Sequence, residues 1–257
     1  MYWTSGRRSD GFGAQFQNIL VDILYTYNIT ADQYIFPNIA SFEHNYTNDS
    51  GFTERLVRYM NLRDYFSLKS GSDISANIQY YSISNYNYVE NNLTQLLASP
   101  TMNVIKTLFY ADKKTPYDTT FYNVAVHVRR HNKEDNRIDG TNTPDEYYLN
   151  VMKYIRANHS HSNTEKPLRF HIYSQCGDAE TEAAFKEKFT SNDTEFHLNG
   201  DVIPTFHGMV FGDALVTSAS SYSYCAAMLN NGVIYYKRFW HKPADFWLIG
   251  DDILPHS

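Results

Sequence analysis

The sequence has little of several features that would place it in a special class. Its only cysteines are Cys176 and Cys225, which cannot form a disulfide framework or a four-thiolate zinc site; both are expected to be free, buried thiols. Twelve glycines and eight prolines are too few for a collagen-like or linker-rich chain. No apolar run approaches the roughly 20 residues that span a bilayer, and the first residues lack the pattern of a signal peptide. These absences predict a protein without a membrane anchor.

Positive charge is also in deficit. The chain has 22 Lys and Arg against 28 Asp and Glu, a net charge of -6, whereas binding to a nucleic-acid backbone requires the opposite balance. Nucleic acid is therefore not an expected partner, and an anionic small ligand would be held by a few local arginines and backbone amides. Apolar residues make up 42% of the chain and charged residues 19%, which is typical of a folded globular protein.

The length of 257 residues allows one large domain or two compact ones. The segment 111–118 is polar, contains Pro116 and lies between better-patterned segments, so it is the expected linker. We therefore predict a first domain over 1–115 and a second over 116–257.

Hydrophobic periodicity predicts α/β structure in both domains. In the first, a short strand over 2–4 and a glycine-containing loop precede a helix over 16–27, and further helices are expected over 52–66, 92–98 and 102–110. In the second, strands are expected over 122–128, 168–174, 195–198, 213–217 and 233–236, with helices starting at 143–146 and covering 178–189 and 220–230. Such alternation predicts a parallel sheet with helices on both faces and ligands at the carboxyl ends of the strands.

Three of the expected turns carry residue types suited to a phosphate. Glycines allow backbone amides to approach a phosphate closely, arginine contacts it in a bidentate manner, and hydroxyl groups at a helix start donate further hydrogen bonds to it. The residues of the three turns are, in chain order, Gly11 and Gly13; His127, Arg129 and Arg130; and Ser218, Ser220 and Ser221. Each turn also has a purely structural interpretation: a tight turn, a surface arginine beside a core histidine, and a helix cap.

Together the three motifs resemble those of the α1,2-, α1,6- and protein O-fucosyltransferase superfamily. The segment 11–17 is similar to the glycine loop near the start of those proteins, His127-Val128-Arg129-Arg130 to their His-x-Arg-Arg signature, and 212–221 to a later strand that leads to a Ser-Ser turn. The resemblance implies a GT-B-like fold of two Rossmann-like domains, with a donor site in the cleft between them. The first domain would lie on the acceptor side, and the second would bind GDP-fucose without a metal.

The resemblance also implies roles for individual residues. Arg129 would hold the donor diphosphate, His127 would contact the nucleotide, and Ser220 or Ser221 would take the phosphate or base, while Arg130 would support the loop. The sequence departs from the family pattern after the arginine pair, where His131-Asn132-Lys133 precede the first acidic residue, and at Thr205, where the family commonly has an acidic residue.

Sugar transfer needs a group that accepts the proton of the acceptor hydroxyl. Glu134, Asp135 and Asp139 follow the arginine pair and are the candidates, although a solvated charged loop accounts for them equally well. Asp10 and Glu43 are the next choices. No Asp-x-Asp motif is present, and His159 with His161 is typical of a polar loop, so no metal is expected.

The leading hypothesis is an inverting, metal-independent transfer of L-fucose from GDP-fucose to a glycan hydroxyl. The alternatives are the same scaffold with another nucleotide sugar, such as UDP-xylose or a GDP- or UDP-deoxyhexose, and a non-catalytic glycan-binding module. The sequence leaves the oligomeric state open. A soluble cytoplasmic enzyme, bacterial or encoded by a large DNA virus, and a trimmed luminal domain both fit these features.

Overall fold

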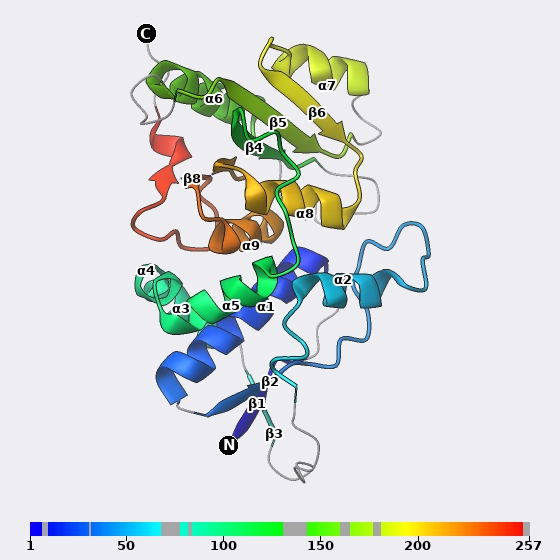
Figure 1. Cartoon of the computed structure of the whole chain (residues 1–257), viewed down its shortest axis with the longest axis vertical. Coiled ribbons are helices and arrows are strands. Elements are labelled where there is room, and N and C mark those ends of the chain that lie inside the picture. Colours follow the sequence, from blue (N-terminus) through cyan, green and yellow to red (C-terminus); the bar gives the residue numbers. More distant parts are fainter. Residues whose placement is uncertain are drawn as a thin grey trace. The chain divides into compact units, whose positions relative to one another are not determined.

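The computed structural model describes residues 1–6, 10–30, 32–67, 78–81, 84–130, 143–159, 165–176 and 181–253. The chain divides into two compact units, Met1–Lys114 and Thr115–Ser257 (Figure 1). The division falls inside the polar segment 111–118. None of the helices in these residues has the length and apolar character needed to span a bilayer.

The first unit contains a small parallel sheet. Its strands are β1 (Tyr2–Thr4), β2 (Gln33–Ile35) and β3 (Ile78–Tyr80), in the order β2-β1-β3. Helix α1 (Phe12–Tyr25) connects β1 to β2 and continues as one turn of π-helix over Thr26–Thr30. The predicted apolar face of this helix is confirmed for Phe16, Ile19, Leu20, Ile23 and Leu24, which are fully buried, but not for Tyr27, which is exposed.

Four further helices complete the described part of this unit: α2 (Phe52–Met60), α3 (Ser84–Asn91), α4 (Leu93–Leu97) and α5 (Pro100–Tyr110). The predicted helix over 52–66 was too long, because the chain turns at Asn61, whose φ of 55° is left-handed. The predicted break at Pro100 is confirmed. Pro100 opens α5, and the hydroxyl of Ser99 caps that helix by accepting a hydrogen bond from the Met102 amide.

The second unit has a six-stranded sheet in which every pairing is parallel. The strands are β4 (Tyr122–Val128), β5 (Leu168–Ser174), β6 (Thr194–Leu198), β7 (Ala214–Val216), β8 (Val233–Tyr236) and β9 (Leu248–Ile249). Their spatial order is β6-β5-β4-β7-β8-β9. Counted within this unit, that is the third, second, first, fourth, fifth and sixth strand, the order of a doubly wound Rossmann sheet. The predicted α/β class with parallel sheets is confirmed.

Helices cover both faces of this sheet. Figure 1 shows α6 (Asp145–His159) and α7 (Glu182–Phe189) on one face, and α8 (Val202–Phe211) and α9 (Ser221–Leu229) on the other. The core under α6 and α7 joins alternate residues of β4 and β5, such as Val126 and Ile172, to Tyr148, Met152 and Phe185 of the helices. In this unit the helix α8 and the strand β9 were not predicted from the sequence; in the first unit, β2 and α3 were not.

Candidate functional site

The strand order creates a switch point between β4 and β7 at the centre of the second unit's sheet. From β4 the chain proceeds through β5 to β6 at one edge, and from β7 it proceeds through β8 to β9 at the other. The strand order therefore reverses direction between β4 and β7, and in doubly wound sheets ligands bind at such a point, at the carboxyl ends of the strands. Val126 of β4 is in register with Val216 of β7. The His-x-Arg-Arg motif and the serine turn, which follow these residues, lie side by side at this point.

His127 is fixed by a contact with the serine turn. Its Nδ1 lies 2.9 Å from the hydroxyl oxygen of Ser218, and its ring meets the ring of Tyr222 edge-on at 5.5 Å between centroids. Burial, with a smaller contribution from the charge of Arg129, lowers the pKa of His127 to about 3. His127 is thus a neutral hydrogen-bonding group at physiological pH, not a cation.

Arg129 reaches the start of helix α9. Its Nη1 donates a hydrogen bond of 3.4 Å to the hydroxyl oxygen of Ser220, which is the N-cap of α9 and also accepts from the Tyr222 amide. A guanidinium group beside the first amides of a helix combines a permanent cation with the positive end of the helix dipole. This arrangement is suited to an oxyanion such as a phosphate.

Arg130 points to the face of the sheet that α6 and α7 cover. It forms an ion pair with Asp145 at the start of α6, and its guanidinium lies 5.4 Å from the ring centroid of Phe185 in α7. The structure therefore brings Arg129 to the serine turn and Arg130 to the α6–α7 side, as the alternation of neighbouring residues requires.

The turn over 217–221 is held from several directions. The amide of Ala219 donates to the hydroxyl of Thr143, just ahead of α6, and the hydroxyl of Ser221 lies 3.3 Å from Nε2 of His241. A turn tied to separate parts of the unit keeps its backbone amides in place without a ligand. The structure thus brings together four of the predicted site residues: His127, Arg129, Ser218 and Ser220, with Ser221 adjoining.

The two predicted glycines lie in the first unit. Helix α1 already begins at Phe12, so Gly11 is its N-cap and Gly13 lies within its first turn, and the expected glycine loop ahead of the helix was wrong at Gly13. A Cβ atom at Gly11 would lie 2.9 Å from the ring of His44, so this glycine packs closely against that side chain. Asp10 and Glu43 meet beside this turn, where the Glu43 amide donates to the Asp10 carbonyl at 3.0 Å.

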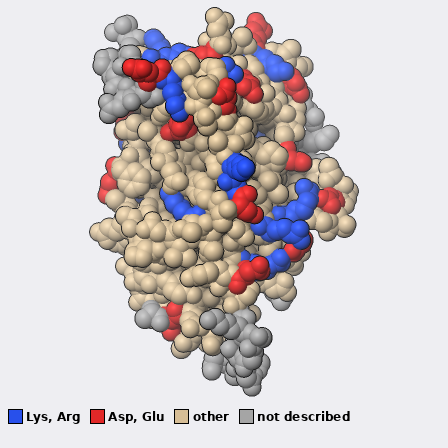
Figure 2. Space-filling view, in the orientation of Figure 1, with Lys and Arg blue, Asp and Glu red and all other residues tan. Residues whose placement is uncertain are grey.

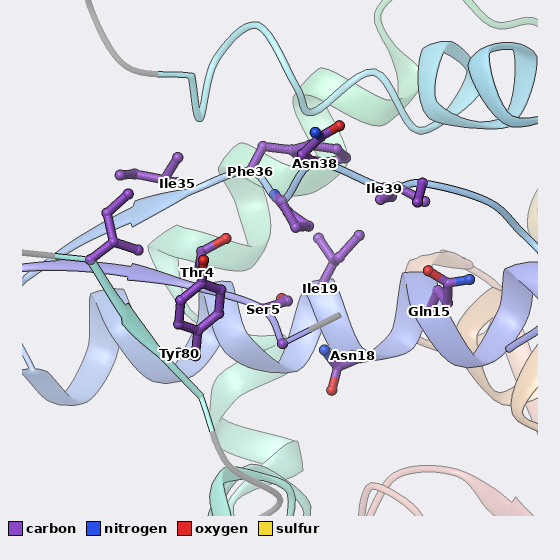
Figure 3. Close-up of a pocket in the computed structure, with 14 residues that line it drawn as sticks. Thr4, Ser5, Gln15, Asn18, Ile19, Ile35, Phe36, Asn38, Ile39 and Tyr80 are labelled. Carbon is purple, nitrogen blue, oxygen red and sulfur yellow. The ribbon is translucent and has the colours of Figure 1, made fainter. Parts of the chain in front are cut away.

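The first unit also contains a pocket that the sequence did not reveal. It has a volume of about 260 Å³ and lies at the carboxyl ends of β1, β2 and β3, where Thr4, Ile35 and Tyr80 line it. Figure 3 shows Ile19 of α1 pointing toward the segment that follows β2. The polar part of the lining includes Ser5, whose hydroxyl contacts a carboxylate oxygen of Asp22 and the hydroxyl of Tyr34, each at 2.6 Å. Residues from three strands and a helix meet there, and no local motif marks them.

The predicted catalytic carboxylates Glu134, Asp135 and Asp139 lie in 131–142, outside the described residues. The two cysteines of the chain are free thiols, but only Cys225 is buried, whereas Cys176 is partly exposed. Among the described residues, one group of side chains has the spacing of metal ligands: His171, Glu195 and His197, on β5 and β6.

Charge is mixed over the visible surface. Figure 2 shows Lys and Arg side chains interspersed with Asp and Glu side chains. In the first unit, Arg55 pairs with Asp49, and Arg63 forms two hydrogen bonds with Glu54. The arginines of such pairs are partly neutralised by their neighbours, so anion binding depends on local geometry of the kind seen at Arg129.

Comparisons with known proteins find no matching family model and no matching curated protein sequence. Solved structures that are similar include the fucosyltransferase NodZ from Bradyrhizobium, with 12% identity, a TM-score of 0.42, and coverage of 89% of this chain and 93% of that one. The E. coli heptosyltransferase WaaC with ADP shares 9% identity, with a TM-score of 0.46 and coverage of 99% and 96%. Arabidopsis thaliana FUT1 in complex with GDP shares 11% identity, with a TM-score of 0.40 and coverage of 96% and 72%. These similarities extend over most of the chain but do not assign it to a family.

Proposed function

We propose that the protein is a glycosyltransferase whose nucleotide-sugar donor binds at the β4–β7 switch point. The observation that carries this proposal is the position of Arg129. Its guanidinium donates a hydrogen bond to the hydroxyl of Ser220, the N-cap of α9, next to the contact between His127 and Ser218. A cation, a helix N-terminus and a neutral imidazole meet at the carboxyl ends of central parallel strands, where doubly wound sheets bind nucleotides.

The chemistry of transfer fits these groups. Breaking the bond between a sugar and a nucleoside diphosphate places negative charge on the leaving phosphate oxygen, and preorganised donors stabilise that charge as it develops. Arg129 and the amides at the start of α9 are such donors, so the proposed mechanism uses no metal at this step. His127, which is neutral, would hydrogen-bond the donor, while Ser218 maintains its orientation.

We further propose GDP-fucose as the donor and inversion at the anomeric carbon, on the resemblance of the three sequence motifs to fucosyltransferases. A carboxylate of 131–142 would accept the proton of the acceptor hydroxyl, with Glu134 and Asp135 ahead of Asp139. The pocket at the β1–β3 carboxyl ends would receive a sugar of the acceptor glycan, because apolar walls beside amide and hydroxyl groups suit a sugar ring.

A panel of GDP, UDP, TDP and their sugars, tested by thermal shift, examines this proposal directly. A ligand bound only by the native protein raises the melting temperature by mass action. We expect GDP and GDP-fucose to raise it, and to raise it less in Arg129→Lys. Arg156→Lys is the matched control, because Arg156 pairs with Asp193 on another part of the same unit.

The other outcomes separate the alternatives. A shift with UDP or UDP-sugars alone would replace GDP-fucose by another donor on the same scaffold. Binding of glycans without a response to any nucleotide would indicate a glycan-binding module and would contradict the proposed transferase.

A further inference from the structure

Three potential metal ligands point to one place on the outer strands of the second unit's sheet. His171 of β5 is in register with Glu195 of β6, and His197 follows two residues along β6, so all three side chains lie on the same face. Their ligand atoms lie within 4.8 Å of one another. This face is opposite to the packed core under α6 and α7. The group is also distinct from the proposed donor site, to which it contributes no contact among the described residues.

The distances between the ligand atoms suit a single small cation. Nδ1 of His171 lies 3.0 Å from Nε2 of His197, while Oε2 of Glu195 lies 3.7 Å from the first nitrogen and Oε1 of Glu195 lies 3.5 Å from the second. Ligand distances of about 2.0–2.1 Å in a tetrahedral zinc site place neighbouring ligand atoms roughly 3.3 Å apart. The two imidazole nitrogens and one oxygen of the exposed Glu195 carboxylate can therefore share one ion after a small adjustment of these side chains.

Asn123 determines the tautomer of His171, so that the unprotonated nitrogen faces the other two ligands. The Asn123 side-chain amide donates to the backbone carbonyls of Asp118 and Phe121, at 2.9 and 3.1 Å, so its Oδ1 is the atom that lies 2.9 Å from Nε2 of His171. Nε2 must then carry the proton, which leaves a lone pair on Nδ1 toward the cluster. A hydrogen bond of this kind behind a ligating histidine is the usual support of a metal site.

Aromatic side chains hold both imidazole rings. Tyr117 packs on His171 with centroids 4.3 Å apart, and Tyr173 stacks on His197 at 4.6 Å and 13°. The hydroxyls of the two tyrosines are in turn 2.8 Å apart. His171 is buried while Glu195 is exposed, so the cluster is preorganised on one side and open to solvent on the other.

We propose that His171, Glu195 and His197 bind one Zn²⁺, with solvent as the fourth ligand. Two imidazoles and one carboxylate are a ligand set that suits zinc, whereas Mg²⁺ and Ca²⁺ prefer oxygen ligands. In the metal-free protein, the N–H group at Nε2 of His197 donates a hydrogen bond to Nδ1 of His171. Zinc replaces this hydrogen atom between the two nitrogens, and neutral His197 changes tautomer so that its proton lies on Nδ1. The ion would tie the edge strand β6 to β5.

Isothermal titration of the metal-stripped full chain with ZnCl₂ tests the site. We expect one Zn²⁺ per chain, and binding at least about ten-fold weaker in Glu195→Gln and in His197→Gln. His159→Gln, which removes a partly exposed histidine elsewhere in the same unit, should bind like the wild type. Zinc binding that is absent from the wild type, or unchanged in both ligand variants, would overturn the proposal.

A spectroscopic measurement on the unaltered protein removes any dependence on how the variants fold. Co²⁺ in a four-coordinate site gives strong visible absorption bands. We expect these bands on adding CoCl₂ to the wild-type protein, and their loss on adding one equivalent of ZnCl₂. A spectrum of octahedral, aqueous Co²⁺ would contradict the proposed site, and neither result depends on nucleotide binding or sugar transfer.

Discussion

The hydroxyl of Ser218 lies 2.9 Å from Nδ1 of His127, although the two residues are 91 positions apart in the chain. The same separation divides Arg129 from Ser220, whose side chains also meet. Each contact joins the end of β4 to the turn after β7, so the proposed donor site exists only when these central strands are paired. For each substitution at the site, the change in ligand affinity can thus be compared with the change in the free energy of unfolding.

Arg129→Lys is expected to weaken GDP binding by about 1 to 3 kcal/mol, because lysine cannot reproduce the bidentate, charge-assisted contact of a guanidinium with a phosphate. Isothermal titration calorimetry of the two proteins measures the difference. Equal affinities would remove Arg129 from the donor site.

Arg130→Ala should act on stability instead. The substitution breaks the ion pair with Asp145 and the contact with the Phe185 ring, and the loss of a charged hydrogen bond at a largely buried site costs roughly 1.5 to 3 kcal/mol. We expect a lower free energy of unfolding in urea and little change in GDP affinity. A large loss of affinity with unchanged stability would assign Arg130 to the ligand.

Replacing the true base by its amide should reduce turnover by roughly 10²- to 10⁴-fold while donor binding stays nearly intact, because the base acts on the proton of the acceptor. Glu134→Gln, Asp135→Asn and Asp139→Asn are to be compared in steady-state assays of sugar transfer. Near-normal turnover in all three would move the search to Asp10 and Glu43.

Transfer should also survive EDTA, since arginine and helix amides stabilise the leaving diphosphate in the proposed mechanism. The assay compares turnover before and after chelation and after readdition of Mn²⁺. Complete loss that Mn²⁺ restores would contradict metal-independent transfer. The proposed zinc at His171, Glu195 and His197 can be distinguished from a metal that is needed for transfer. Its removal by EDTA should lower the melting temperature without abolishing transfer.

The buried His127 should make the protein less stable in mild acid. Its pKa is about 3 in the folded protein and 6.5 ordinarily, so below about pH 6.5 the unfolded chain takes up a proton there that the folded chain does not. This contribution is fully present above that pH and declines toward pH 3. Between about pH 7.5 and 5.5 the wild type should lose about 1 kcal/mol more unfolding free energy than His127→Asn. Urea denaturation measures both, and equal losses would show that His127 does not stay neutral.

Much of the second unit could be predicted because its strands are strongly patterned. The alternating valines of β4 and the hydroxyl-rich start of α9 are local signals, and parallel strands bring their carboxyl ends together. Helix α8 was not predicted because Pro204 and Gly208 interrupt its helical hydrophobic pattern. Pro204 is tolerated in the first turn, where amides have no helical partner, and Gly208 is needed because the Tyr173 hydroxyl occupies the space a Cβ would take.

The proposed zinc site and the pocket of the first unit could not be predicted by the same reasoning. His171 and Glu195 become neighbours only through the register of β5 with β6, which hydrophobic patterning does not specify to the residue. The side chains around the pocket come from three strands and α1, and they carry no common motif. In contrast, His127, Arg129 and Ser220 could be placed together from the sequence, because their own segments mark the strand ends near which they lie.

The pairing of β4 with β7 has a consequence for how the protein is made. The Asn123 amide, at the start of β4, is bonded to the Asp213 side chain, 90 residues further along. A ribosome delivers the chain from its amino end, so β4, β5 and β6 emerge well before β7, and during that interval one edge of β4 has no partner strand. An apolar strand with an open edge is prone to join other chains. A pause in synthesis between β6 and β7 therefore leaves this edge of β4 open to pairing with other chains.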